Sequence, residues 1–328
     1  MERPYRKFVS ALATVWLALA IGGFAYARIL GLPGHWTAPL VAAFLWEASF
    51  YIAPGFSAVR QAAVQRWPGP LFAAGLTASA MAPYLVYTLP LGLFDPLPAL
   101  ALALLAAAAS FWFVALPASK WTDFSFVAFM AAPVVARLFQ ELYPAPAATV
   151  PLSILGQLMW IRLGIWAILC LRRVEEVGFG FWPSSREWLC GLRYYLYFLP
   201  VGLTLALGIG LVRFRPVQLD WWLAAAYAAA TFFGMLWVVA LSEEFFFRGL
   251  LQPWLARSFG SRIAGLLLAA CLFGLVHLPF RGFPNWRFAL VAAVAGVFYG
   301  LARDRSRGIR AAMVAHALVN TTMRLFFS

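Results

Sequence analysis

Three charged side chains lie close together inside a long apolar stretch of the sequence, in the segment LSEEFFFRGLL. Glu243, Glu244 and Arg248 each cost roughly 2.5–3.5 kcal/mol to insert at the centre of a membrane helix, so a function or a compensating contact is expected. Glu244 and Arg248 are four residues apart, with the acid first, and can pair on one helix face. Glu243 is left without a local counter-charge. It is therefore the sharper candidate for a general base that takes a proton from water.

Two of the three histidines lie in apolar stretches that follow this segment. His277, in FGLVHLP, lies about as far after the turn near Gly260 as Glu244 lies before it, so an antiparallel hairpin would bring both to similar depth. His316 and Asn320, in HALVN, are four residues apart and project from one helix face. A carboxylate and a histidine can deprotonate a water, while a second histidine and an amide can donate hydrogen bonds to an oxyanion. This set of groups predicts amide hydrolysis.

The composition places these residues in a membrane. Of the 328 residues, 64% are hydrophobic and 11% are charged, which is outside the range of soluble globular domains. Several apolar runs reach the roughly 20 residues that cross about 30 Å of hydrocarbon as a helix. The sequence predicts an all-α, polytopic transmembrane helix bundle of about 8–11 helices with an intramembrane catalytic cavity. The candidate spans are residues 8–29, 36–55, 71–94, 97–117, 122–141, 149–171, 190–212, 221–257, 263–280, 287–303 and 310–327.

The longest polar interruption, RRVEEVGFGFWPSSREW at residues 172–188, indicates a domain boundary. It mixes charged residues with aromatic ones such as Trp182 and Trp188, as expected for a segment at the headgroup level. Residues 1–174 are expected to form N-terminal transmembrane helices of unassigned role. Residues 175–328 are expected to form the catalytic transmembrane domain.

The net charge of +13 orients the helices in the membrane and does not indicate nucleic-acid binding. Most arginines lie in short segments between apolar runs, as the positive-inside rule requires, although Arg213 and Arg215 fall on the other side. Three cysteines without a CxxC pair predict neither disulfides nor structural zinc. The preference for Arg over Lys and the abundance of Ala favour a GC-rich bacterial genome, and hence the bacterial cytoplasmic (inner) membrane.

Three motifs in order, EExxxR, FxxxH from Phe273 to His277, and HxxxN from His316 to Asn320, resemble the CPBP family of intramembrane glutamic proteases. This family includes the type II CAAX prenyl proteases. The resemblance covers roughly residues 175–328, including the GFGFWPSSREW segment before the motifs.

The resemblance implies a role for each candidate residue and no cofactor. Glu243 and His277 would activate the attacking water, and His316 and Asn320 would stabilise the tetrahedral oxyanion. Glu244 with Arg248 would support the site. The implied substrate is a membrane-anchored or lipidated protein or peptide that reaches a buried water from the bilayer, and the motifs do not select among such substrates.

Three other readings of the same residues stay open. One Glu and two His could bind zinc and leave a position for water, as in a metalloprotease, although HExxH is absent. The cluster could instead bind a ligand or proton in a non-enzymatic transporter, immunity factor or scaffold. It could also be a buried polar knot that only holds helices together.

Overall fold

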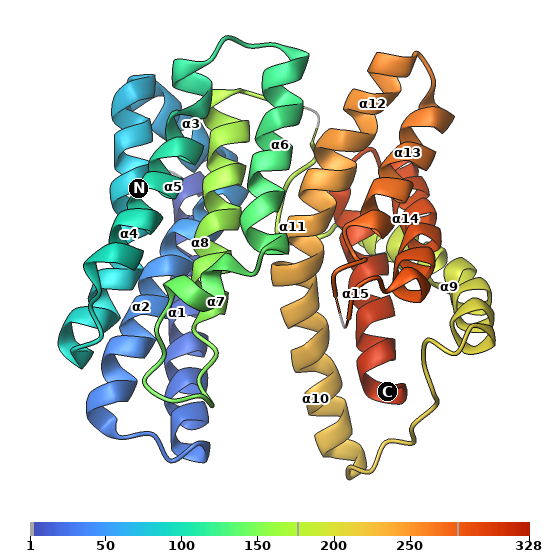
Figure 1. Ribbon diagram of the computed structural model, residues 1–328, viewed down its shortest axis with the longest axis horizontal. Helices are drawn as coiled ribbons and strands as arrows, with labels where there is room; N and C mark the ends of the chain where they lie inside the picture. Colours follow the sequence, from blue (N-terminus) through green and yellow to red (C-terminus); the bar gives the residue numbers. More distant parts are fainter. Residues whose placement is uncertain (1–2, 176, 281) are drawn as a thin grey trace. The chain divides into compact units, whose positions relative to one another are not determined.

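The structure, a computed structural model, describes residues 3–175, 177–280 and 282–328. Helices dominate these residues, and the extended pairing among them is a single antiparallel bridge between Phe214 and Phe327. The chain divides into two compact units, Met1–Val174 and Glu175–Ser328. Figure 1 shows the helices of both units.

The N-terminal unit is a bundle of helices with one sharply bent pair. The chain bends by 94° between Gly34–Gly55 and Ser57–Arg66. Asp95 and Ser119 cap two of the helices, because each side chain accepts a hydrogen bond from a backbone N–H of the first turn. The elements are α1 (Arg3–Ile29), α2 (Gly34–Ile52), η1 (Ala53–Gly55), α3 (Ser57–Arg66), α4 (Gly69–Leu91), α5 (Pro96–Ala115), α6 (Lys120–Val135), α7 (Leu138–Leu142), α8 (Ser153–Trp166) and η2 (Ala167–Leu171).

A buried ion pair lies in the core of this unit. Arg162 of α8 donates to Glu47 Oε1 of α2 at 2.6 Å, and both side chains are fully buried. The same guanidinium donates to the hydroxyl of Ser79 at 3.0 Å and to its carbonyl at 2.9 Å. This network joins α2, α4 and α8. The ion pair and the hydrogen bonds to Ser79 offset the hydration that the two charges lose on burial.

The C-terminal unit contains all six candidate catalytic residues. Ser184 and Glu187 form a reciprocal capping box at the start of α9. Ser261 and Asn285 cap the N-termini of helices α13 and α14, because their side chains accept hydrogen bonds from backbone N–H groups of the first turn. The elements are α9 (Ser185–Gly208), α10 (Trp221–Gly234), η3 (Met235–Ala240), α11 (Leu241–Glu244), η4 (Phe245–Leu251), α12 (Gln252–Phe259), α13 (Arg262–Leu275), α14 (Trp286–Ser306) and α15 (Ile309–Phe326).

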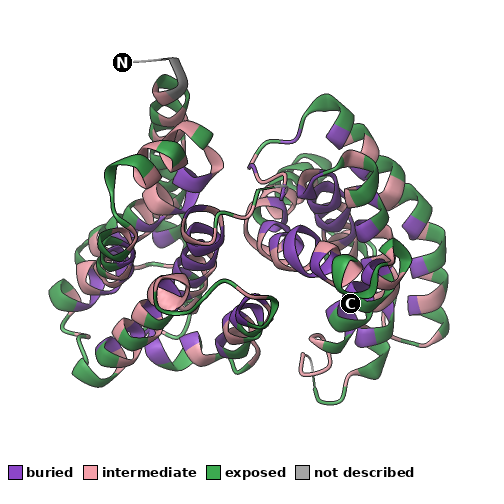
Figure 2. Ribbon diagram, turned by 90° about the horizontal axis from the view of Figure 1, so that it is seen from above, coloured by how far each residue is buried: buried purple, intermediate pink, exposed green. Residues whose placement is uncertain are grey.

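The outer faces of both bundles are apolar. Figure 2 shows buried residues on the inner sides of the helices and exposed residues on the outer sides. The exposed side chains include Leu17, Ile29, Leu97 and Trp221, which are 64–84% accessible. Such large exposed apolar surface marks a membrane environment. The protein is therefore an integral, multi-pass membrane protein.

The number of helices that qualify as full membrane spans is below the upper end of the 8–11 predicted from the sequence. Among the described residues, 7 helices are long and apolar enough to cross a membrane, or 8 if the bent pair is one span. The other predicted segments are helical but short or polar. Helix α6 has 16 residues and α13 has 14, while α15 carries His316 and Asn320. Helices α6 and α13 are shorter than the segments predicted for them, because hydropathy alone does not locate the ends of a helix.

The buried pair in the N-terminal unit generates a stability prediction. We expect Glu47→Ala to lower the free energy of unfolding by about 3–5 kcal/mol, because Arg162 would stay buried without its counter-charge. Chemical denaturation of the purified protein in detergent measures this change. The control is Glu141→Ala, which removes an exposed acid of the same unit and should shift stability by no more than about 0.5 kcal/mol. Equal stability of the two variants would contradict a structural role for the pair.

Candidate active site

The two glutamates lie in the middle of one long helical run, Trp221–Phe259. Two π-helical stretches, η3 and η4, flank the single α-helical turn that carries Glu243 and Glu244. Such π-helical insertions widen a helix locally and occur frequently at functional sites. The helix is therefore irregular at the residues that the sequence singled out.

Glu244 accepts hydrogen bonds from two cationic or cation-forming side chains through one oxygen. Its Oε1 lies 3.2 Å from Nη1 of Arg248, the partner expected four residues later. The same oxygen lies 2.7 Å from Nδ1 of His316 on α15. Glu244 and Arg248 are fully buried. The carboxylate thus links its own helix to the last helix of the chain.

Arg248 is enclosed by groups from two further helices. Its Nη2 donates to the carbonyl of Gly296 on α14 at 3.1 Å. Its guanidinium carbon lies 4.2 Å from the ring centre of Phe273 on α13, a cation–π distance. A Cβ atom at position 296 would lie 2.9 Å from Nη2, so glycine permits this close approach.

The imidazole of His316 is held in a defined orientation. Its Nδ1 must carry a proton to donate to Glu244, because the carboxylate can only accept. The ring of Tyr299 stacks on it, with centres 4.7 Å apart and planes 12° apart. Nε2 then points toward Glu243, with 3.8 Å between Nε2 and Oε2. One histidine therefore contacts both glutamates, which sequence spacing had not indicated.

Glu243 differs from Glu244 in its surroundings. Its side chain is 30% exposed, whereas that of Glu244 is fully buried. Among the described residues, the buried Oε2 of Glu243 has no hydrogen-bond partner, and neither has Oε2 of Glu244, so the two acids differ in exposure and in the bonds of the other oxygen. A buried acceptor without a partner is uncommon, and a water or substrate group can satisfy it.

His277 lies just after the end of α13, in a turn. Its Nδ1 lies 2.6 Å from the carbonyl of Phe273, so Nδ1 carries the proton and Nε2 of the neutral ring can accept one. The rings of Phe273 and Phe288 pack edge-on against it, each with centres 4.8 Å away. Phe273 also packs over Arg248, so the part of α13 just before His277 lies against the helix that carries the glutamates. The similar depth of His277 and Glu244 stays a prediction.

Asn320 follows His316 by one turn of α15. Its amide nitrogen lies 3.8 Å from the sulfur of Met235 on η3. A thioether is a weak acceptor, so this contact leaves the amide able to donate elsewhere. Asn320 is half-buried, on the helix that carries His316.

The structure joins four of the six predicted residues by direct contacts and places the other two nearby in the same unit. Glu243, Glu244, Arg248 and His316 are joined by direct contacts, and Asn320 follows His316 on the same helix. His277 is linked to the set through the Phe273 ring, whose centre is 5.8 Å from that of His316. Sequence reasoning missed Tyr299 and Gly296. Their signal was a tyrosine and close-set glycines in the apolar segment AGVFYG.

No three His, Cys, Asp or Glu side chains form a group able to hold a metal ion in the part of the chain that the structure describes. Glu244 and Arg248 offset each other's charge.

Comparison with known families agrees with the motifs. Residues 222–322 match the family model described as Type II CAAX prenyl endopeptidase Rce1-like. All six candidate residues lie within this stretch. No curated protein sequence and no solved structure matches the chain. Over residues 222–322 the C-terminal unit of this membrane protein is therefore similar to the type II CAAX prenyl endopeptidase Rce1-like family.

Proposed function

We propose that the C-terminal unit hydrolyses peptide bonds within the membrane by a glutamic mechanism, in which Glu243 activates the attacking water. The observation that carries this proposal is the asymmetry of the two glutamates. Glu244 is fully buried and bonded to Arg248 and His316, whereas Glu243 is 30% exposed and its Oε2 lies 3.8 Å from Nε2 of His316. The first has the surroundings of an orienting group and the second those of a base.

The first chemical step adds water to the scissile carbonyl. Glu243 takes a proton from the water as its oxygen bonds to the carbonyl carbon, and the carbonyl oxygen becomes an oxyanion. The cationic imidazole of His316, which carries a proton on each ring nitrogen, and the amide of Asn320 donate hydrogen bonds to that oxyanion. Glu244 stabilises the protonated imidazole through Nδ1, because the two atoms are 2.7 Å apart.

The second step breaks the carbon–nitrogen bond. The oxyanion re-forms the carbonyl, and the proton taken from water passes to the leaving amine. His277 orients the water by accepting a hydrogen bond from it at Nε2. The Phe273 carbonyl accepts from Nδ1–H and leaves Nε2 as the acceptor. Arg248 holds the Glu244 carboxylate in place through the 3.2 Å ion pair.

The substrate class follows from where the site lies. The glutamates are in a long apolar helix, so a peptide must be close to the bilayer to reach them. A membrane-anchored or lipidated protein meets this requirement, and the matched family is described by its action on prenylated CAAX proteins. The proposal extends to membrane-associated peptides in general and places the protein in a bacterial cytoplasmic membrane.

A zinc-dependent mechanism is the second candidate for the chemistry, since Glu and His are zinc ligands. Metal analysis of the purified protein distinguishes the two mechanisms. Stoichiometric zinc, with activity lost to a chelator and restored by zinc, would replace the glutamic mechanism. Full activity after chelation supports it.

Glu243→Gln is expected to reduce cleavage to background, because the amide keeps the shape of the side chain but cannot accept the proton. Cleavage is measured by comparing the termini of membrane proteins in cells that carry the wild-type or variant chain. The amount of protein in the membrane should be unchanged. The control Glu175→Gln alters an exposed glutamate of the same unit and should keep activity. Cleavage retained by Glu243→Gln would remove Glu243 from the mechanism and favour a non-enzymatic role.

Asn320→Ala is expected to lower turnover about 10²–10³-fold, the usual loss for one oxyanion donor. Its stability should change little, because the contact that it loses is a weak one to sulfur. His316→Ala should lose both turnover and stability, because it also removes a donor from buried Glu244. Thr322→Ala is the matched control. Thr322 lies on the same helix as Asn320, and the substitution removes its 2.8 Å contact with Tyr195. Parallel losses of abundance and turnover in Asn320→Ala would favour the polar-knot reading.

A further inference from the structure

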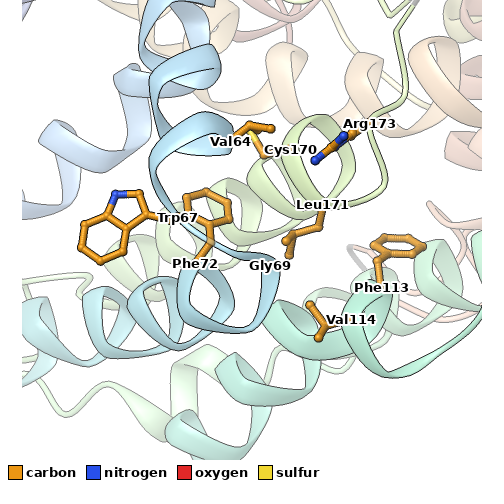
Figure 3. Close-up of a pocket in the computed structure, with 9 residues that line it drawn as sticks. All are labelled: Val64, Trp67, Gly69, Phe72, Phe113, Val114, Cys170, Leu171 and Arg173. Carbon is orange, nitrogen blue, oxygen red and sulfur yellow. The ribbon is translucent and has the colours of Figure 1, made fainter.

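A hollow in the N-terminal unit is lined without a carboxylate or a histidine among the described residues. Figure 3 shows its lining, which includes Trp67, Phe113, Cys170 and Arg173. The groups able to assist hydrolysis are therefore those around the glutamates of the C-terminal unit. One buried aromatic side chain there, Tyr299 of α14, lies against the proposed acid–base groups and is 2% exposed.

The ring of Tyr299 lies face to face with the imidazole of His316. The two ring centres are 4.7 Å apart, and the ring planes are 12° apart. Helix α14 runs beside α15, so the tyrosine reaches the histidine from the neighbouring helix (Figure 1). The ring of Phe273 stands at 75° to Tyr299 and at 87° to His316, with centres 6.1 Å and 5.8 Å away. A third ring therefore packs against both members of the stack.

The face of an aromatic ring attracts a cation, because its π-electrons carry partial negative charge. The attraction is significant within about 6 Å of the ring centre and is strongest where water is excluded. In the proposed mechanism, His316 carries a proton on each ring nitrogen while it donates to the oxyanion. The positive charge of the imidazole then lies over the buried face of Tyr299 and within this distance.

The other charged groups near this stack are Arg248 and the two glutamates. The guanidinium carbon of Arg248 lies 5.4 Å from the ring centre of Tyr299 but 4.2 Å from that of Phe273, which is thus its closer aromatic partner. Glu243 and Glu244 both face His316, and their negative charge favours the same cationic form. The ring of Tyr299 and the two carboxylates therefore act on His316 in the same direction.

His277 has a different set of aromatic neighbours. The rings of Phe273, Phe280 and Phe288 stand at 62°, 50° and 80° to its imidazole. These inclined rings differ from the parallel stack at His316. The stack thus distinguishes the histidine that is proposed to carry positive charge from the one that is proposed to accept a hydrogen bond from water.

We propose that Tyr299 is a positioning residue, whose ring face stabilises the cationic form of His316 and keeps Nε2 turned toward Glu243. Tyr299 acts through His316 and does not touch the substrate. The inference rests on the proposed glutamic mechanism, in which His316 donates to the oxyanion. It assigns the contribution to the π face of the ring and not to the hydroxyl group.

The ring is tested by keeping its shape and changing its charge distribution. Fluorinated phenylalanines are close in shape to phenylalanine, and each fluorine withdraws electron density from the ring face. Phenylalanine and its mono-, di- and trifluorinated forms are placed at position 299 of the full-length chain by nonsense suppression. The same fluorinated series at Phe298 is the matched control, because Phe298 is the adjacent residue of α14 and packs against Phe198 at 5.7 Å.

Tyr299→Phe should keep turnover within about twofold, whereas Tyr299→Leu should lower it about tenfold, the usual effect of one desolvated cation–π contact. Turnover should fall with each fluorine at position 299, at unchanged KM, and should stay constant in the series at Phe298. The substrate is a membrane protein whose terminus differs between cells with the wild type and cells with Glu243→Gln. Equal losses in Tyr299→Phe and Tyr299→Leu would overturn the proposal, because the hydroxyl would then carry the effect.

The protonation of His316 is a second readout, and it needs no substrate. The chain has three histidines, so nitrogen NMR of histidine-labelled protein assigns His316 once His35→Gln and His277→Gln have identified the other two. At a pH where the wild type shows both forms, the cationic fraction of His316 should fall along the fluorinated series.

A constant cationic fraction and constant turnover along the series would overturn the proposal. A thermal midpoint that falls with fluorination while turnover stays constant would also overturn it, since the ring would then act on Arg248. Absence of any cleavage that depends on Glu243 would instead refute the proposed function, and the cationic fraction of His316 would still report on the ring.

Discussion

A carboxylate buried in a membrane helix must be matched by donors, and Glu244 is the carboxylate on which the C-terminal unit depends. One of its oxygens accepts from Arg248 and from His316. Arg248 in turn needs the carbonyl of Gly296 and the face of Phe273. Those four partners come from η4, α15, α14 and α13. The cost of burying one charge therefore fixes how four helical segments pack, because leaving any partner out would strand a buried charge.

The N-terminal unit also buries a carboxylate beside an arginine, but there the charged groups of the pair are fully enclosed. Glu47 and Arg162 neutralise each other, both fully buried, and Ser79 satisfies the remaining guanidinium nitrogens. In the C-terminal unit, by contrast, Arg248 and Glu244 pair and a second carboxylate, Glu243, remains part-exposed. The difference between a structural pair and a candidate site is this surplus acid, since a paired and enclosed carboxylate cannot reach a water.

Helical spacing predicted contacts within a helix but not those between helices. It paired Glu244 with Arg248, and these side chains lie 3.2 Å apart. It could not show that His316 contacts both glutamates, because that depends on how α15 is rotated against the other helices. Hydropathy likewise found the apolar segments but counted short helices such as α13, of 14 residues, as spans. Helix ends depend on turns and caps, which carry weak hydropathy signals.

The surroundings of His316 restrict the direction from which a substrate can approach in the proposed mechanism. Glu244 occupies Nδ1, Tyr299 covers a ring face, and Phe273 packs edge-on at 5.8 Å. Nε2 is the ring atom that faces Glu243, the part-exposed acid. A water and a peptide carbonyl must then enter along the edge between Nε2 and Glu243. Because these neighbours are fixed before substrate arrives, the site needs little reorganisation as charge develops on the oxyanion.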